Sequence, residues 1–168
     1  LSSNLYASQD YIQSTVTTVE VPSSVKQIGD AYGSISSAYG IFANCTSLQT
    51  VLLPKGLESI ADRTFSDCTS LKNITIPNSL QYVGNRAFDN VGITSLTLGE
   101  NMKAIGYDAF NGCTSLITVR VNSKELRECY ATFKDSPIEK VTFGPKVEYV
   151  PALLKDNASV IKVVFEED

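Results

Sequence analysis

The feature that most constrains this chain is a group of three apolar residues that recurs seven times along it. In each copy the first apolar residue is followed three positions later by a second, and two positions after that by a third. Because the last two alternate with polar residues and are largely β-branched, each copy predicts a short strand with one buried face. The seven copies are Val16-Val19-Val21, Leu48-Val51-Leu53, Leu71-Ile74-Ile76, Ile93-Leu96-Leu98, Leu116-Val119-Val121, Ile138-Val141-Phe143 and Val160-Val163-Phe165.

The residues around the triplets define a repeat of 21–23 residues. The tetrapeptide CTSL stands at residues 45–48, 68–71 and 113–116, and each copy begins three residues after a Phe. That closing position recurs at Phe42, Phe65, Phe88, Phe110, Phe133 and Leu154. Each strand is followed by a turn residue or the chain end and, in all but the last unit, by a second pair of apolar residues. Such a unit is too small to bury its own apolar face, so stacked copies are expected to share one core.

We therefore predict a leucine-rich-repeat solenoid of about seven repeats of 21–23 residues, coiled right-handedly. A parallel β-sheet is expected on its concave face, with short strands, turns or 3-10/helical turns on the convex face. At 168 residues the chain suits one domain. Within it, residues 15–165 form the repeats, residues 1–14 are either a cap or the remnant of a unit, and residues 33–41 are an insertion loop.

One stretch carries a specific resemblance. Residues 65–88, FSDCTSLKNITIPNSLQYVGNRAF, resemble the unit F-x-x-C-x-S-L-x-x-I-x-I-P-x-S-L-x-x-I-G-x-x-A-F of the BspA-like leucine-rich repeat family. The resemblance covers roughly residues 15–165. It departs in the first unit, where 14 residues separate Ile28 from Phe42 instead of five, and at the end, where Leu154 replaces the Phe. It implies a bacterial cell-surface or secreted, extracellular protein that adheres to host matrix proteins or to other cells.

Composition narrows the function in the same direction. The sequence contains no His, which removes the commonest general base and the usual zinc ligand. The net charge is −4 with dispersed basic residues, which disfavours nucleic-acid binding. No apolar run approaches the roughly 18 residues of a membrane span. We therefore expect no catalytic residue, no metal, no cofactor, no nucleic-acid partner and no membrane insertion, and a monomer rather than an oligomer.

The cysteines suggest structure rather than chemistry. Cys45, Cys68 and Cys113 share one repeat position, filled elsewhere by Val91, Ser136 and Asn157. Such a position is expected to turn inward and hydrogen-bond the backbone between coils, as in leucine-rich repeats generally. Cys129 replaces a core Ile. We expect four free thiols, although a bond between Cys45 and Cys68 in adjacent coils is conceivable.

A short polar residue also recurs two positions after the closing residue, as in some calcium-binding repeats. Turn chemistry explains these side chains more simply, because Asn and Asp suit turns. The recurring residues are Asn44, Asp67, Asn90, Asp135 and Asp156.

The outward side of the strands is the candidate binding face, because solenoids usually bind through their concave sheet. Its candidate contacts are mostly small and polar, namely Thr50, Leu52, Asn73, Thr75, Thr97, Thr118, Arg120, Lys140, Thr142 and Lys162. Tyr32 and Tyr39 in the insertion are candidate loop contacts for a macromolecular partner.

Three functional hypotheses remain open. The first is a non-enzymatic adhesion module that binds a host or neighbouring-cell protein through the sheet. The second is a glycan-binding module whose exposed tyrosines, such as Tyr82, Tyr107 and Tyr149, stack on sugars. The third is a spacer without a ligand of its own.

Overall fold

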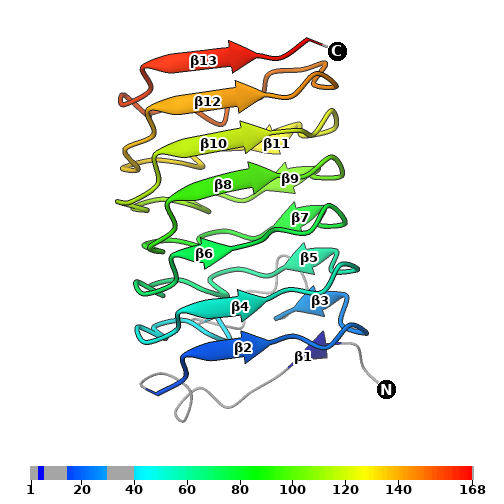
Figure 1. Cartoon of the computed structure of the whole chain (residues 1–168), viewed down its shortest axis with the longest axis vertical. Helices are drawn as coiled ribbons and strands as arrows, with labels where there is room; N and C mark the ends of the chain where they lie inside the picture. Colours follow the sequence, from blue (N-terminus) through cyan, green and yellow to red (C-terminus); the bar gives the residue numbers. More distant parts are fainter. Residues whose placement is uncertain (1–3, 6–14, 30–39, 168) are drawn as a thin grey trace.

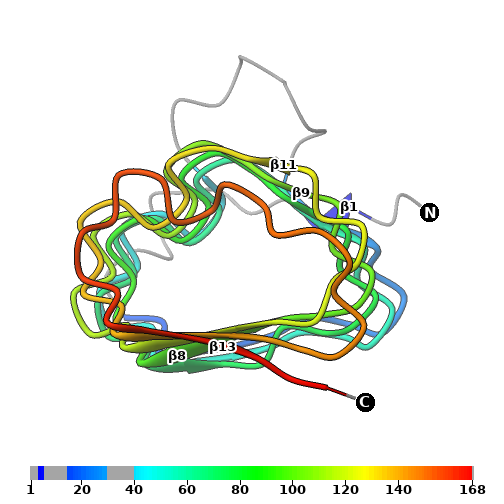
Figure 2. The same ribbon diagram turned by 90° about the horizontal axis from the view of Figure 1, so that it is seen from above.

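The computed structural model describes residues 4–5, 15–29 and 40–167. They form a right-handed stack of coils, which Figure 1 shows from the side and Figure 2 from above. Only strands occur as regular elements among these residues. Short strands therefore occupy the second side of the coil, where the sequence also allowed turns or helical turns.

Each predicted triplet contributes one strand to the front of Figure 1. The polar residues between the apolar ones point outward, so the burial alternates along most of these strands. The seven front strands are β2 (Thr18–Glu20), β4 (Thr50–Leu52), β6 (Asn73–Ile74), β8 (Ser95–Leu98), β10 (Thr118–Val121), β12 (Lys140–Phe143) and β13 (Lys162–Phe165).

All the front strands that pair do so in parallel, but the ladder is not continuous. β2, β4 and β6 form one sheet, and β8, β10, β12 and β13 form another. The break coincides with a coil that is one residue shorter after Phe88 than the coil before it. Gly92 packs against the preceding coil there, and a Cβ at this position would lie 2.4 Å from the Thr69 carbonyl oxygen.

Proline explains why the first three front strands are shorter than the last four. Pro22 and Pro54 have no N–H with which to continue the ladder, and the same holds for Pro77 after β6. From β8 onward the matching residue has an N–H. Asn122, for example, donates to the Leu98 carbonyl at 2.9 Å, and Gly144 donates to the Val121 carbonyl at 2.8 Å.

The second apolar pair of each unit forms the opposite wall, which we call the back sheet. It has six parallel strands of two residues each, in sequence order along the stack. They are β1 (Asn4–Leu5), β3 (Gln27–Ile28), β5 (Ser59–Ile60), β7 (Tyr82–Val83), β9 (Ala104–Ile105) and β11 (Glu128–Cys129).

β1 bears on the interpretation of residues 1–14. Asn4 pairs with Gln27 and Leu5 with Ile28, each 23 residues further along the chain. These two residues therefore hold the second-strand position of a coil that precedes β2, which agrees with the remnant alternative. The other residues of that segment lie outside the described part.

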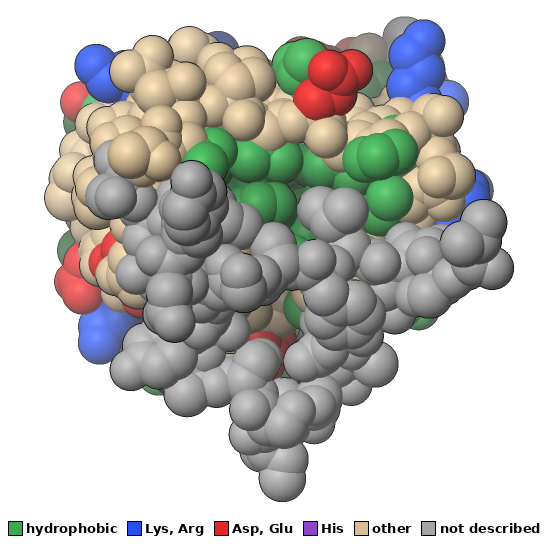
Figure 3. Space-filling view, turned by 90° about the horizontal axis from the view of Figure 1, so that it is seen from below, with side chains coloured by type: hydrophobic (Ala, Val, Ile, Leu, Met, Phe, Trp, Pro, Cys, Tyr) green, Lys and Arg blue, Asp and Glu red, His purple; other side chains and the backbone are tan. Residues whose placement is uncertain are grey.

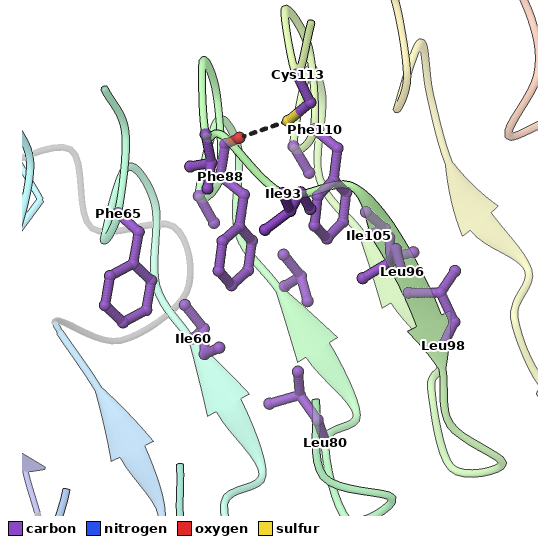
Figure 4. Packing of buried hydrophobic residues seen from close by; sticks show 14 of the residues in the cluster. Ile60, Phe65, Leu80, Phe88, Ile93, Leu96, Leu98, Ile105, Phe110 and Cys113 are labelled. Carbon is purple, nitrogen blue, oxygen red and sulfur yellow. Dashed lines mark hydrogen bonds between the residues drawn. The ribbon is translucent and has the colours of Figure 1, made fainter. Parts of the chain in front are cut away.

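A column of phenylalanine rings runs through the core between the two walls. Phe42, Phe65, Phe88, Phe110 and Phe133 stack in succession, with centroids 5.5, 5.4, 5.0 and 5.6 Å apart. This spacing follows the coil-to-coil distance, and nearly parallel offset rings are a favourable aromatic geometry. Figure 4 shows Phe65, Phe88 and Phe110 side by side, and Figure 3 shows apolar side chains at the N-terminal end of the stack.

Removal of a ring from the middle of this column should destabilise the fold strongly. Phe88 is fully buried and stacks on both sides, so Phe88→Ala is expected to cost about 3–5 kcal/mol. Phe88→Leu should cost less, because it keeps most of the apolar volume. The measurement is urea unfolding followed by circular dichroism.

Tyr107→Ala is the matched control, because this aromatic is half-exposed and should change stability by no more than about 0.5 kcal/mol. A loss for Phe88→Ala no larger than that of the control would show that the column does not hold the coils together.

Candidate functional site

The front face presents two outward columns of side chains, one from each polar position of the strands. Within each sheet they lie in register, as Thr118, Lys140 and its neighbour Lys162 do in one column. The candidate residues Thr50, Leu52, Asn73, Thr75, Thr97, Thr118, Lys140 and Lys162 are all exposed, as alternation predicts. Figure 2 shows this side of the coils as nearly flat, so it offers area rather than a deep cleft.

The prediction that Thr142 is exposed is wrong, because only 8% of its surface is accessible. Thr142 lies in register between Arg120 and Val164. The Arg120 guanidinium reaches past it to Glu166 and donates a bond of 2.7 Å to one carboxylate oxygen and a second bond to the other. The ion pair therefore covers the threonine.

The same ion pair changes what Arg120 can offer a partner. Its hydrogen bonds hold the pKa of the Glu166 carboxyl below the ordinary value and raise the pKa of Arg120. Arg120 is therefore neutralised within the chain, whereas Lys140 and Lys162 remain as exposed positive charges at the C-terminal end of the face.

The remaining part of the front face carries no charge. We define the central front face as the exposed outward residues of β4 to β10 and the segment after β6, namely Thr50, Leu52, Asn73, Thr75, Ser95, Thr97 and Thr118. Leu52 is the large apolar side chain among them and is 52% exposed. Tyr32 and Tyr39 lie outside the described residues, as does most of the 33–41 insertion, so these remain predictions.

A second surface feature lies on the back sheet, and the sequence analysis found only one of its residues. It is a groove of about 380 Å³. Gln27, Ser59, Tyr82, Ala104 and Glu128 line it in strand register. The signal that could have located it is the second apolar pair, because the residue before the inward Ile or Val of each pair faces outward.

The shared cysteine position is structural, as predicted. The Cys68 thiol donates to the Phe42 carbonyl at 3.1 Å, and the Cys113 thiol donates to the Phe88 carbonyl at 3.2 Å, the bond drawn in Figure 4. Ser136 and Asn157 make the same bond to the closing Phe of the preceding coil, each at 2.8 Å. At this position Val91 has no polar atom with which to make the bond.

All four cysteines are free thiols and buried. Burial raises the pKa of Cys68 and Cys113 to about 12 and that of Cys129 to about 11, and it also raises the pKa of Cys45. The thiolate is the nucleophile and the metal ligand, so these cysteines are poorly suited to either role near neutral pH.

Backbone conformation explains the recurring Asn and Asp. Asn44, Asp67, Asn90, Asp135 and Asp156 all have positive φ, between 56° and 66°, and Gly112 fills the same position at 63°. Asn, Asp and Gly are the residues that tolerate this left-handed conformation best. Within the described residues, no three His, Cys, Asp or Glu side chains are grouped to hold a metal ion. The described part also lacks any helix with the length and apolar character of a membrane span.

The fold and the repeat define a class, the β-solenoid proteins built from leucine-rich repeats. The family described as "BspA type Leucine rich repeat region" matches residues 34–158 in six copies. The chain therefore belongs to this family. A search of curated proteins found no match.

Solved bacterial structures share the fold. A leucine-rich repeat protein of T. pallidum is 28% identical, with a TM-score of 0.56 over 86% of this chain and 64% of its own. The pneumococcal vaccine antigen PcpA is 20% identical, with a TM-score of 0.69 over 99% of this chain and 44% of its own. A Bacteroides ovatus leucine-rich repeat protein is 18% identical, with a TM-score of 0.52 over 90% and 56%. The chain thus spans about half to two thirds of these structures.

The hydrogen bonds at the cysteine position can be tested at Ser136. Its hydroxyl donates to the Phe110 carbonyl and accepts the Cys113 backbone N–H at 3.0 Å. Ser136→Val leaves that buried N–H without its partner and should cost about 1–3 kcal/mol of unfolding free energy. Ser136→Cys places at this site the residue that two other coils use to donate, and it should cost less.

Both variants are compared by urea unfolding. Equal stability of Ser136→Val and the parent chain would show that the bonds between coils at this position contribute nothing to stability.

Stability should also fall at alkaline pH because of the buried thiols. The folded-state pKa of Cys68 is about 12 against an ordinary value of 9.0, so the folded protein keeps this proton while the unfolded chain loses it. The contribution is complete below about pH 9 and declines above it, by at most about 1.4 kcal/mol per pH unit for each thiol. Urea unfolding between pH 7 and 10.5 measures the slope.

Cys68→Ser keeps a hydroxyl donor that does not ionise in this range, so its stability should fall less steeply with pH than that of the parent. The lysines and tyrosines titrate alike in both proteins. Superimposable pH profiles would refute the role of this thiol.

Proposed function

We propose that this chain is a non-enzymatic module of a secreted or cell-surface bacterial protein, and that it binds another protein through the central front face. Membership in a family of leucine-rich repeats supports a protein-interaction role. The observation that carries the proposal is the uncharged outward surface around the exposed Leu52.

The arrangement of charge fits a protein partner. Protein interfaces have a core depleted in charged residues and a polar rim. Here the neutral surface is bordered by Glu20 at one end and by Lys140 and Lys162 at the other. The Lys side would suit a partner with an acidic rim, and Leu52 would supply the apolar anchor.

The dimensions predict weak binding by the strands alone. Seven strands at about 4.8 Å and four residues at about 3.3 Å give a face of roughly 29 by 13 Å, or about 380 Å². A standard interface buries about 800 Å² on each partner. Side chains of the adjoining turns must therefore contribute, or several modules must bind together. Adhesion through many weak contacts suits such a surface.

The test is binding of the purified chain to immobilised extracellular-matrix proteins and mucin by surface plasmon resonance. Thr50→Lys with Ser95→Lys brings two charges into the central front face, at the column where Lys140 and Lys162 stand naturally. This double variant and Leu52→Thr should each weaken binding about tenfold without lowering stability, because all three residues are exposed.

Tyr130→Ser, which changes an exposed residue away from the front strands, is the control and should bind as the parent does. Binding that all variants retain, or that moderate salt abolishes in all of them, would exclude the central front face as the contact surface.

A further inference from the structure

The groove on the back sheet lies on the opposite wall of the coils from the front face, as Figure 2 shows for the two sets of strands. It extends along the stack from Gln27 on β3 to Glu128 on β11. This length corresponds to four strand spacings, or about 19 Å. The groove is therefore elongated along the axis of the solenoid and has hydrogen-bonded strands as its floor.

Tyr82 stands in the middle of this groove between two small side chains. Its neighbours in register are Ser59 on one side and Ala104 on the other. Because both are short, the flanks of the tyrosine ring are not covered within its column, and 39% of the residue is exposed. An exposed aromatic ring with an apolar face is a platform on which the C–H face of a sugar ring can stack.

Planar polar side chains surround the platform. Glu58 and Gln81 line the groove beside Tyr82, and Gln27 and Glu128 lie toward its two ends. Amide groups both donate and accept hydrogen bonds and carboxylates accept them, which matches hydroxyl groups that do both. Glu58 also pairs with Lys26 at 3.5 Å, which offsets one of the two negative charges.

The strands beneath the groove make a peptide a poor occupant. β3, β5, β7 and β9 are each paired with a strand on both sides, so no free edge exists there for an added strand. A peptide would therefore lose the main-chain hydrogen bonds that carry strand addition. Two carboxylates in the lining also disfavour sialylated or sulfated sugars through repulsion between like charges.

We propose that this groove binds a neutral oligosaccharide, with Tyr82 as the stacking platform and Glu58, Gln81, Gln27 and Glu128 as hydrogen-bonding partners for its hydroxyl groups. The site is separate from the central front face, and the proposal does not depend on the function proposed for that face. Of the three tyrosines that the sequence suggested for sugar binding, the geometry selects Tyr82. Tyr149 instead packs under the Arg127 guanidinium at 4.7 Å, and Tyr107 is outside the groove lining.

The experiment is saturation-transfer NMR and titration calorimetry of the full chain with four probes: cellohexaose, chitohexaose, maltohexaose and the anionic 3′-sialyllactose. At least one neutral hexasaccharide should bind, and the sialylated probe should not. Tyr82→Ala should weaken that binding at least about tenfold, whereas Tyr82→Phe, which keeps the ring, should stay within about twofold of the parent.

Two controls separate this site from other surfaces. Tyr107→Ala removes an exposed aromatic outside the groove, and the front-face double variant Thr50→Lys with Ser95→Lys disturbs only the proposed protein contact; both should bind sugar as the parent does. The proposal is overturned if no neutral probe binds at millimolar concentration, or if Tyr82→Ala binds undiminished. It is also overturned if only 3′-sialyllactose, or only an oligo-lysine peptide added as a competitor probe, occupies the groove.

Discussion

The structure depends on the parallel stacking of coils in register, because no coil can bury its apolar residues without the next one. Each unit contributes two short strands and one closing aromatic, and each meets its equivalent 21–23 residues away. Rings such as Phe88 and Phe110, with centroids 5.0 Å apart, can stack only if the period is kept. Stability is therefore a property of the neighbour contacts, as in repeat proteins generally.

This constraint separates the positions that must be conserved in chemistry from those that are free to vary. Inward positions require apolar volume, and the position of Cys68 requires a small side chain, which in most coils donates a hydrogen bond to the backbone. Outward positions need only tolerate a strand. The two walls of the coil can therefore carry different surfaces, an uncharged face around Leu52 and a groove around Tyr82, without a change in the core.

The triplets predicted the seven front strands because a period of two within a period of 21–23 admits few other structures. The inward cysteine position was predicted for the same reason. The break between β6 and β8 was not, since it depends on how the shortened coil at Gly92 packs against Thr69. The binding face was predicted in part: alternation identified its outward residues, but it could not show that the Arg120–Glu166 pair covers Thr142.

The sequence by itself determined the period, the direction of the strands and the inward or outward orientation of most side chains, because all three follow from local spacing. The tertiary structure alone decided which outward residues are available and which of them meet. Arg120 and Glu166 are 46 residues apart, and the residues around Tyr82 come from five different coils. Such contacts depend on side-chain reach across stacked coils, and no local pattern in the chain encodes that reach.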